Sequence, residues 1–138
     1  MRTTARFRRR LWAWGPAVLW AAVIFVLSSL SANHVPILPG QTDKLVHGTV
    51  YAILGALCFR AIAMTWTWPH RPAIAIATLL ALLYGVTDEI HQTFTPGRTP
   101  DWRDALADMI GGLVGALVFA AVSRSRGPRR EESRQRDG

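Results

Sequence analysis

The sequence predicts an all-α membrane protein, built as a bundle of four transmembrane helices. Three observations lead to this fold class. Half of the 138 residues are hydrophobic, the apolar residues gather in four long runs, and basic residues concentrate at the two ends of the chain. The apolar runs do not alternate with polar residues at a period of two, which disfavours strands. A chain of this length is expected to form a single domain.

The first span is expected over residues 11–30, which carry no charge. Twenty such residues are enough to cross a hydrocarbon core of roughly 30 Å as a helix. An alternative interpretation is a cleaved signal peptide, because basic residues precede the run and small residues follow it, but the run is longer than usual for such a peptide. The second span is expected over residues 45–62, with His47 and Arg60 near its two ends.

The third span is expected over residues 72–90 and carries Asp88 and Glu89 in its last turn. The fourth is expected over residues 105–122, with Asp108 about one turn from its start. Ionisable side chains near a helix end are tolerated because they reach the headgroup region. Segments rich in proline and glycine separate the four runs and predict short loops.

Charge distribution predicts the orientation of these spans. Thirteen of the sixteen basic residues lie in the two tails or beside the loop between spans two and three, and only Lys44, Arg98 and Arg103 lie on the other side. The positive-inside rule then places both termini in the cytoplasm. The chain divides into a basic cytoplasmic amino-terminal tail over 1–10, a transmembrane domain over 11–122, and a basic, disordered cytoplasmic tail over 123–138.

Composition also excludes several classes of protein. The single cysteine, Cys58, rules out a disulfide framework and a cysteine-based zinc site. The net charge of +7 is confined largely to arginines in the tails and forms no basic face on a folded element, which argues against nucleic-acid binding.

Acidic residues converge on one level of the predicted bundle. Six of the nine lie at the non-cytoplasmic ends of spans two to four or in the loop between spans three and four, namely Asp43, Asp88, Glu89, Asp101, Asp104 and Asp108. Lys44 and Arg98 fall at the same level. This convergence predicts a polar pocket that opens toward the outer face of the membrane.

Helical spacing predicts which faces line this pocket, because residues three or four apart share one side of a helix. The three stripes are Asp43, His47 and Tyr51; Tyr84, Asp88, His91 and Gln92; and Asp104, Asp108, Gly111 and Gly115. A carboxylate that faced lipid would cost several kcal/mol, so the stripes are expected to point inward. The pair Gly111 and Gly115 would let two helix backbones approach closely.

Three motifs occur in a distinctive order and spacing. They are Asp43-Lys44-x-x-His47 with Tyr51, Tyr84-Gly85-Val86-Thr87-Asp88-Glu89-x-His91-Gln92, and Pro96-Gly97-Arg98 followed by Asp101, Asp104 and Gly111-Gly112. Together they resemble the VanZ-like family over residues 11–122. This family consists of small bacterial membrane proteins, named for a member that is encoded with glycopeptide-resistance genes and raises tolerance to teicoplanin. The resemblance implies a cell-envelope role in a bacterial cytoplasmic membrane, but no reaction. The chain departs from the family at Asp108, where asparagine is common.

Several roles for these polar residues remain open. His47 and His91 with Asp43, Asp88 or Glu89 would suit zinc or another divalent ion, although no recognised ligand spacing occurs. Asp88, Glu89 and His91 are the candidates for acid–base catalysis. The residues expected to line the pocket are Asp43, Lys44, His47, Tyr51, Tyr84, Gln92, Arg98, Asp101, Asp104 and Asp108. A purely structural network of hydrogen bonds and ion pairs is the competing interpretation.

Two main hypotheses for function follow. In the first, the protein binds or acts on cell-envelope lipids or surface-acting, glycopeptide-type antibiotics. In the second, it is an intramembrane hydrolase or transferase, acid–base or metal-dependent, in which Arg98 holds the anionic headgroup of a lipid-linked substrate. A small proton-coupled transporter, which would require an oligomer, is a weaker third. Membrane lipids are the expected partners, and no motif identifies a cofactor.

Overall fold

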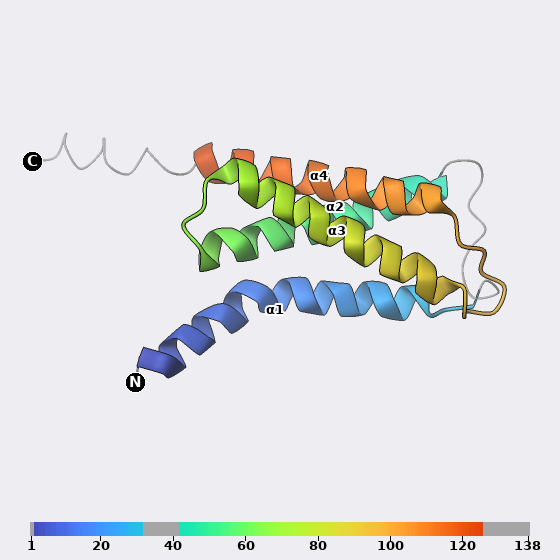
Figure 1. The fold of residues 1–138 in the computed structure, drawn as a ribbon, viewed down its shortest axis with the longest axis horizontal. Helices are drawn as coiled ribbons and strands as arrows, with labels where there is room; N and C mark the ends of the chain where they lie inside the picture. The colour runs from blue at the N-terminus through green and yellow to red at the C-terminus, as the bar shows by residue number, and fades with distance from the viewer. Residues whose placement is uncertain (1, 32–41, 126–138) are drawn as a thin grey trace, which may run out of the picture.

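The fold is a bundle of four helices (Figure 1). The computed structural model describes residues 2–31 and 42–125, apart from the side chains of residues 2 and 43. The helices are α1 (Arg2–Ser28), α2 (Thr42–Thr65), α3 (His70–Gln92) and α4 (Trp102–Ser125), and the described residues contain no strand. Each helix is long and apolar enough to cross a membrane. The predicted all-α bundle of four membrane-spanning helices is therefore confirmed.

α2, α3 and α4 extend beyond both ends of their predicted apolar spans, whereas α1 extends beyond the first end only and stops at Ser28, before the predicted end at residue 30. α1 begins at Arg2, so the described part of the basic amino-terminal segment is helical. α4 continues to Ser125, and the remainder of the predicted carboxyl-terminal tail, residues 126–138, lies outside the described residues. Hydropathy marks only the stretch that lipid has to cover. A helix can satisfy its backbone hydrogen bonds internally beyond that stretch, whatever the polarity of its side chains.

Small residues bring α2 and α4 into direct backbone contact. A Cβ atom added at Gly111 would overlap the carbonyl oxygen of Gly48, and one added at Gly115 would overlap that of Ala52. The predicted role of Gly111 and Gly115 in close helix approach is thus confirmed. Both helices start at the same end of the bundle and run parallel, and α3 packs against the pair (Figure 1).

α1 lies at the side of the bundle, where it contacts α2 and α3 but not α4. Directional hydrogen bonds attach it. The Trp20 indole donates to the Val50 carbonyl at 2.9 Å, and the Tyr84 hydroxyl donates to the Ala21 carbonyl at 2.6 Å. Buried Tyr and Trp side chains commonly use their polar atoms in this way. These bonds fix the position of α1 along α2 and α3.

The amino-terminal part of α1 bends away from the other helices (Figure 1). Pro16 lies inside this helix and has no N–H, so the Trp12 carbonyl loses its usual intrahelical donor. The Arg60 guanidinium donates to the carbonyls of Trp12 and Ala13, at 3.2 and 3.3 Å. Arginine from α2 therefore satisfies backbone acceptors at the proline kink.

We expect Gly115→Ala to lower the free energy of unfolding by about 1–3 kcal/mol, because the new methyl group forces α2 and α4 apart. Thermal unfolding of the detergent-purified protein measures the change. Gly15→Ala is the matched control, since a Cβ at Gly15 meets nothing within 4 Å. Equal melting temperatures for the two variants would contradict backbone contact between α2 and α4.

We expect Arg60→Met to lower the free energy of unfolding by about 1 kcal/mol, because it leaves the Trp12 carbonyl without its donor. In a Pro16→Ala background the loss should be smaller, since alanine restores the missing N–H. A double-mutant cycle in detergent measures this coupling. Equal losses in both backgrounds would show that Arg60 does not compensate for the proline.

Candidate functional site

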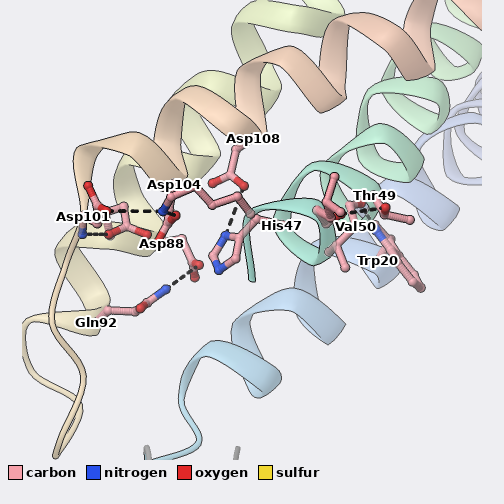
Figure 2. Close-up of polar contacts among 12 residues, drawn as sticks. Trp20, His47, Thr49, Val50, Asp88, Gln92, Asp101, Asp104 and Asp108 are labelled. Carbon is pink, nitrogen blue, oxygen red and sulfur yellow. Dashed lines mark hydrogen bonds and ion pairs between the residues drawn. The ribbon is translucent and has the colours of Figure 1, made fainter. Parts of the chain in front are cut away.

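Charged side chains gather where α2 and α4 begin and α3 ends, opposite the described ends of the chain (Figure 2). We call this set the acidic cluster: Lys44, His47, Asp88, Glu89, Gln92, Asp101, Asp104 and Asp108. The helix starts favour acidic residues, because the unpaired N–H groups of a first turn carry partial positive charge. The predicted convergence of charged residues from three helices is thus present in the structure.

Lys44 links α2 to the start of α4. Its Nζ atom lies 2.6 Å from Asp104 Oδ1 and 3.3 Å from Asp101 Oδ2. All three side chains are partly exposed, so solvent weakens these ion pairs. The lysine therefore neutralises carboxylates at the edge of the acidic cluster.

Asp101 caps the first turn of α4. Its Oδ1 atom accepts a hydrogen bond of 2.9 Å from the Arg103 N–H, and its own N–H donates to Glu89 Oε2 at 2.8 Å. A carboxylate at this position satisfies a backbone donor that has no partner within the helix. Because Glu89 belongs to α3, the cap also fastens the start of α4 to the last turn of α3.

Asp108 is the most deeply buried member of the cluster. Its side chain is 0% exposed, and its Oδ1 atom lies 3.2 Å from His47 Nδ1 (Figure 2). Gly85 of α3 makes room for the carboxylate, since a Cβ there would come within 2.7 Å of Asp108 Oδ2. The pair therefore sits where α2, α3 and α4 meet.

Three buried polar atoms near this point have no hydrogen-bond partner among the described residues: Asp108 Oδ2, Glu89 Oε1 and the Tyr51 hydroxyl. Tyr51 is 1% exposed, and its hydroxyl lies within Coulombic range of Asp108, Asp88 and Glu89. Glu89 is likewise within range of Asp108 and His47. Buried polar groups without a hydrogen-bond partner are uncommon in protein interiors, so three of them in one region require an explanation.

The structure brings some predicted residues together and separates others. Gln92 donates to Asp88 at 3.2 Å within the cluster. His91 instead faces α1, with Nε2 3.0 Å from Ser29 Oγ and its ring 4.6 Å from that of Phe25. His47 and His91 therefore have different neighbours. Among the described side chains, no three His, Cys, Asp or Glu residues are placed to hold a metal ion.

Arg98 and Tyr84 bind backbone rather than carboxylates. The Pro96-Gly97 pair forms a turn in which Gly97 has a φ of 77° and the Arg98 N–H bonds the Thr95 carbonyl at 3.1 Å. Such a turn requires glycine at its third position. Beyond it, Arg98 Nε donates to the Leu30 carbonyl at 3.2 Å. The Tyr84 hydroxyl donates to the Ala21 carbonyl of α1. The side chain of Asp43 lies outside the described residues.

Two residues that matter here received no role from the sequence alone. Ser29 bonds His91, and Gly85 provides the space for the Asp108 carboxylate. The signal for Ser29 would have been that α1 and α3 end at the same level, which follows from the predicted topology. The signal for Gly85 would have been its position four residues after Ala81, because two small residues at this spacing permit close packing of helices.

The pKa of the Asp101 carboxyl is held below its usual value, chiefly by the hydrogen bond from the Arg103 N–H and then by Lys44. The folded state therefore binds this proton less readily than the unfolded state does. Its stabilising contribution is complete above the unfolded pKa of about 3.9 and is lost as the pH falls through the lower folded value.

We expect Asp101→Ala to reduce the melting temperature at pH 7 and the difference from wild type to shrink as the pH is lowered below about 4. Asp101→Asn, which keeps a capping oxygen, should lie between the two proteins at pH 7. Thermal unfolding between pH 3 and pH 7 measures both differences. A gap between wild type and Asp101→Ala that is independent of pH would contradict a stabilising role for the charged carboxylate.

The comparisons with known proteins agree with this architecture. A family model described as VanZ/LLP1 matches residues 11–123. No curated protein and no solved structure matches the chain. The matched region begins within α1 and ends within α4, so it contains the whole acidic cluster and most of each helix. By this match over most of its length, the chain belongs to the VanZ/LLP1 family.

Proposed function

We propose that this VanZ-like protein resides in a bacterial cytoplasmic membrane and binds a cell-envelope ligand at the acidic cluster. The ligand is an envelope lipid or a surface-acting antibiotic of the glycopeptide type. The observation that carries the proposal is Asp108, a fully buried carboxyl group inside a membrane-spanning helix. Ionisable groups at such positions are costly and mark binding or transport sites in membrane proteins.

Charge distribution supports an outward-facing cluster. The described basic residues near the opposite end of the bundle include Arg6, Arg8, Arg9 and Arg10. Under the positive-inside rule this end, with both termini, lies in the cytoplasm. The acidic cluster then lies at the outer leaflet, where envelope lipids and antibiotics that act on the cell surface are found. This position favours the cell-envelope role implied by family membership.

The alternative function is an intramembrane hydrolase or transferase that acts on a lipid-linked substrate. The observation in its favour is the contact between His91 Nε2 and Ser29 Oγ at the same end of the bundle. Two observations weigh against it. Ser29 already donates to the Phe25 carbonyl at 2.7 Å, and His91 faces α1 whereas Asp88 and Glu89 are buried among α2, α3 and α4. Binding without chemistry is therefore the better supported proposal.

A binding measurement on the detergent-purified chain tests the proposal. We expect teicoplanin, or a bacterial envelope-lipid extract, to raise the melting temperature of the wild-type protein. In Glu89→Gln and Asp108→Asn the ligand's affinity should fall at least tenfold, about 1.4 kcal/mol, because both variants remove a buried acceptor charge. Arg103→Gln is the control, since this exposed side chain at the same end rests on Trp102.

The outcomes separate the two functions. If neither teicoplanin nor the lipid extract changes the melting temperature, the binding proposal is wrong. If mass spectrometry shows that the wild-type protein cleaves a lipid while folded Glu89→Gln and His91→Ala do not, the hydrolase or transferase replaces it.

A further inference from the structure

Negative charge outweighs positive charge in the acidic cluster. Its described side chains include five carboxyl groups, those of Asp88, Glu89, Asp101, Asp104 and Asp108, against Lys44 and His47. Of the two arginines nearby, Arg98 bonds the Leu30 carbonyl, and the Arg103 guanidinium lies 5.9 Å from the centre of the Trp102 ring and acts on Asp101 by its charge alone. Even with a protonated histidine, the carboxyl groups exceed the cations. Burying unpaired charge is costly, so a further positive group would stabilise the cluster.

The unpartnered atoms indicate where such a group would bind. Asp108 Oδ2, Glu89 Oε1 and the Tyr51 hydroxyl are buried, belong to three different helices, and have no hydrogen-bond partner among the described residues. Asp108 Oδ2 lies against Gly85, which is one turn before Glu89 on α3, and the charges of both carboxyl groups act on the Tyr51 hydroxyl. The rings of Tyr51 and Tyr84 are 6.2 Å apart, and aromatic faces attract cations. We call these three atoms the inner acceptor set.

We propose that the inner acceptor set binds a primary ammonium group. This inference rests on the proposed function and names the chemistry of its ligand. A primary ammonium carries three N–H donors on a compact charge, which matches three acceptors drawn from two carboxyl groups and a hydroxyl. A phosphate or carboxylate would be repelled by the same oxygens. A quaternary ammonium brings charge but no donor, so it satisfies none of the three atoms.

Two sources present this chemistry at the outer leaflet: the headgroup of an aminophospholipid and the amine of a water-soluble ligand. Lys44 and His47 are the partly exposed cationic members of the cluster, with side chains that are 24% and 23% exposed. A cation bound at the inner acceptor set would not displace Lys44. The ion pairs of Lys44 with Asp104 and Asp101 would therefore remain at the edge of the cluster.

The test measures binding to the detergent-purified full chain by its melting temperature. The probes are lysophosphatidylethanolamine, lysophosphatidylcholine, lysophosphatidylglycerol and free ethylammonium. We expect a rise with lysophosphatidylethanolamine, none with the other two lysolipids, and at least tenfold weaker binding in Glu89→Gln and Asp108→Asn. Arg103→Gln should bind as wild type does. A rise with ethylammonium as well identifies the amine alone as sufficient, and its absence assigns recognition to the lipid headgroup.

Several results would overturn the inference. Binding of the choline or glycerol lysolipid as tight as that of the ethanolamine one removes the ammonium specificity, while leaving an envelope-lipid role in place. The same holds if teicoplanin or the lipid extract binds and no amine probe does. If the charge variants unfold, Tyr51→Phe decides. It removes only the hydroxyl oxygen, so it should weaken ethanolamine binding at an unchanged melting temperature, and unchanged binding rejects the site.

Discussion

Backbone contact between α2 and α4 is the constraint on which the rest of the structure depends. Because Gly48 lies against Gly111 and Ala52 against Gly115, the two parallel helices approach without intervening side chains and are fixed in register. That register sets His47 beside Asp108 and Lys44 beside Asp104, at distances short enough for hydrogen bonds. Larger residues along this seam would separate the donors on α2 from the carboxylates on α4. The charged cluster is therefore a product of glycine packing.

α1 is held by a different kind of interaction. It does not join the glycine seam, and its attachment relies on side-chain donors that reach main-chain carbonyls. The Arg9 guanidinium donates to the Met64 carbonyl at the end of α2, as Arg60 does to the carbonyls beside Pro16. These donors satisfy carbonyls that have no partner within their own helix, and they act together with the apolar contacts of Ala17 and Ile24 in the core.

Much of the fold and part of the site could be predicted from the sequence. The four long apolar runs predict four helices. Because successive helices cross the membrane in opposite directions, the acidic residues at the start of α2, the end of α3 and the start of α4 reach the same level. Rotation of α3 about its axis was harder to predict. His91 and Gln92 are adjacent residues, about 100° apart around the helix, so they cannot both face the centre fully. Gln92 turns toward Asp88 and His91 toward α1, which depends on how α1 packs.

The missing side chain at Gly85 has a consequence for how this chain can evolve. The Asp108 carboxylate occupies the volume where a Cβ at position 85 would lie. The two positions share one space, although they are far apart in the sequence and on different helices. Whether a substitution is tolerated at either position therefore depends on the residue at the other position. A side chain can enter at position 85 only if the Asp108 carboxylate turns aside or residue 108 becomes smaller, so the shared volume couples the substitutions that the two positions tolerate.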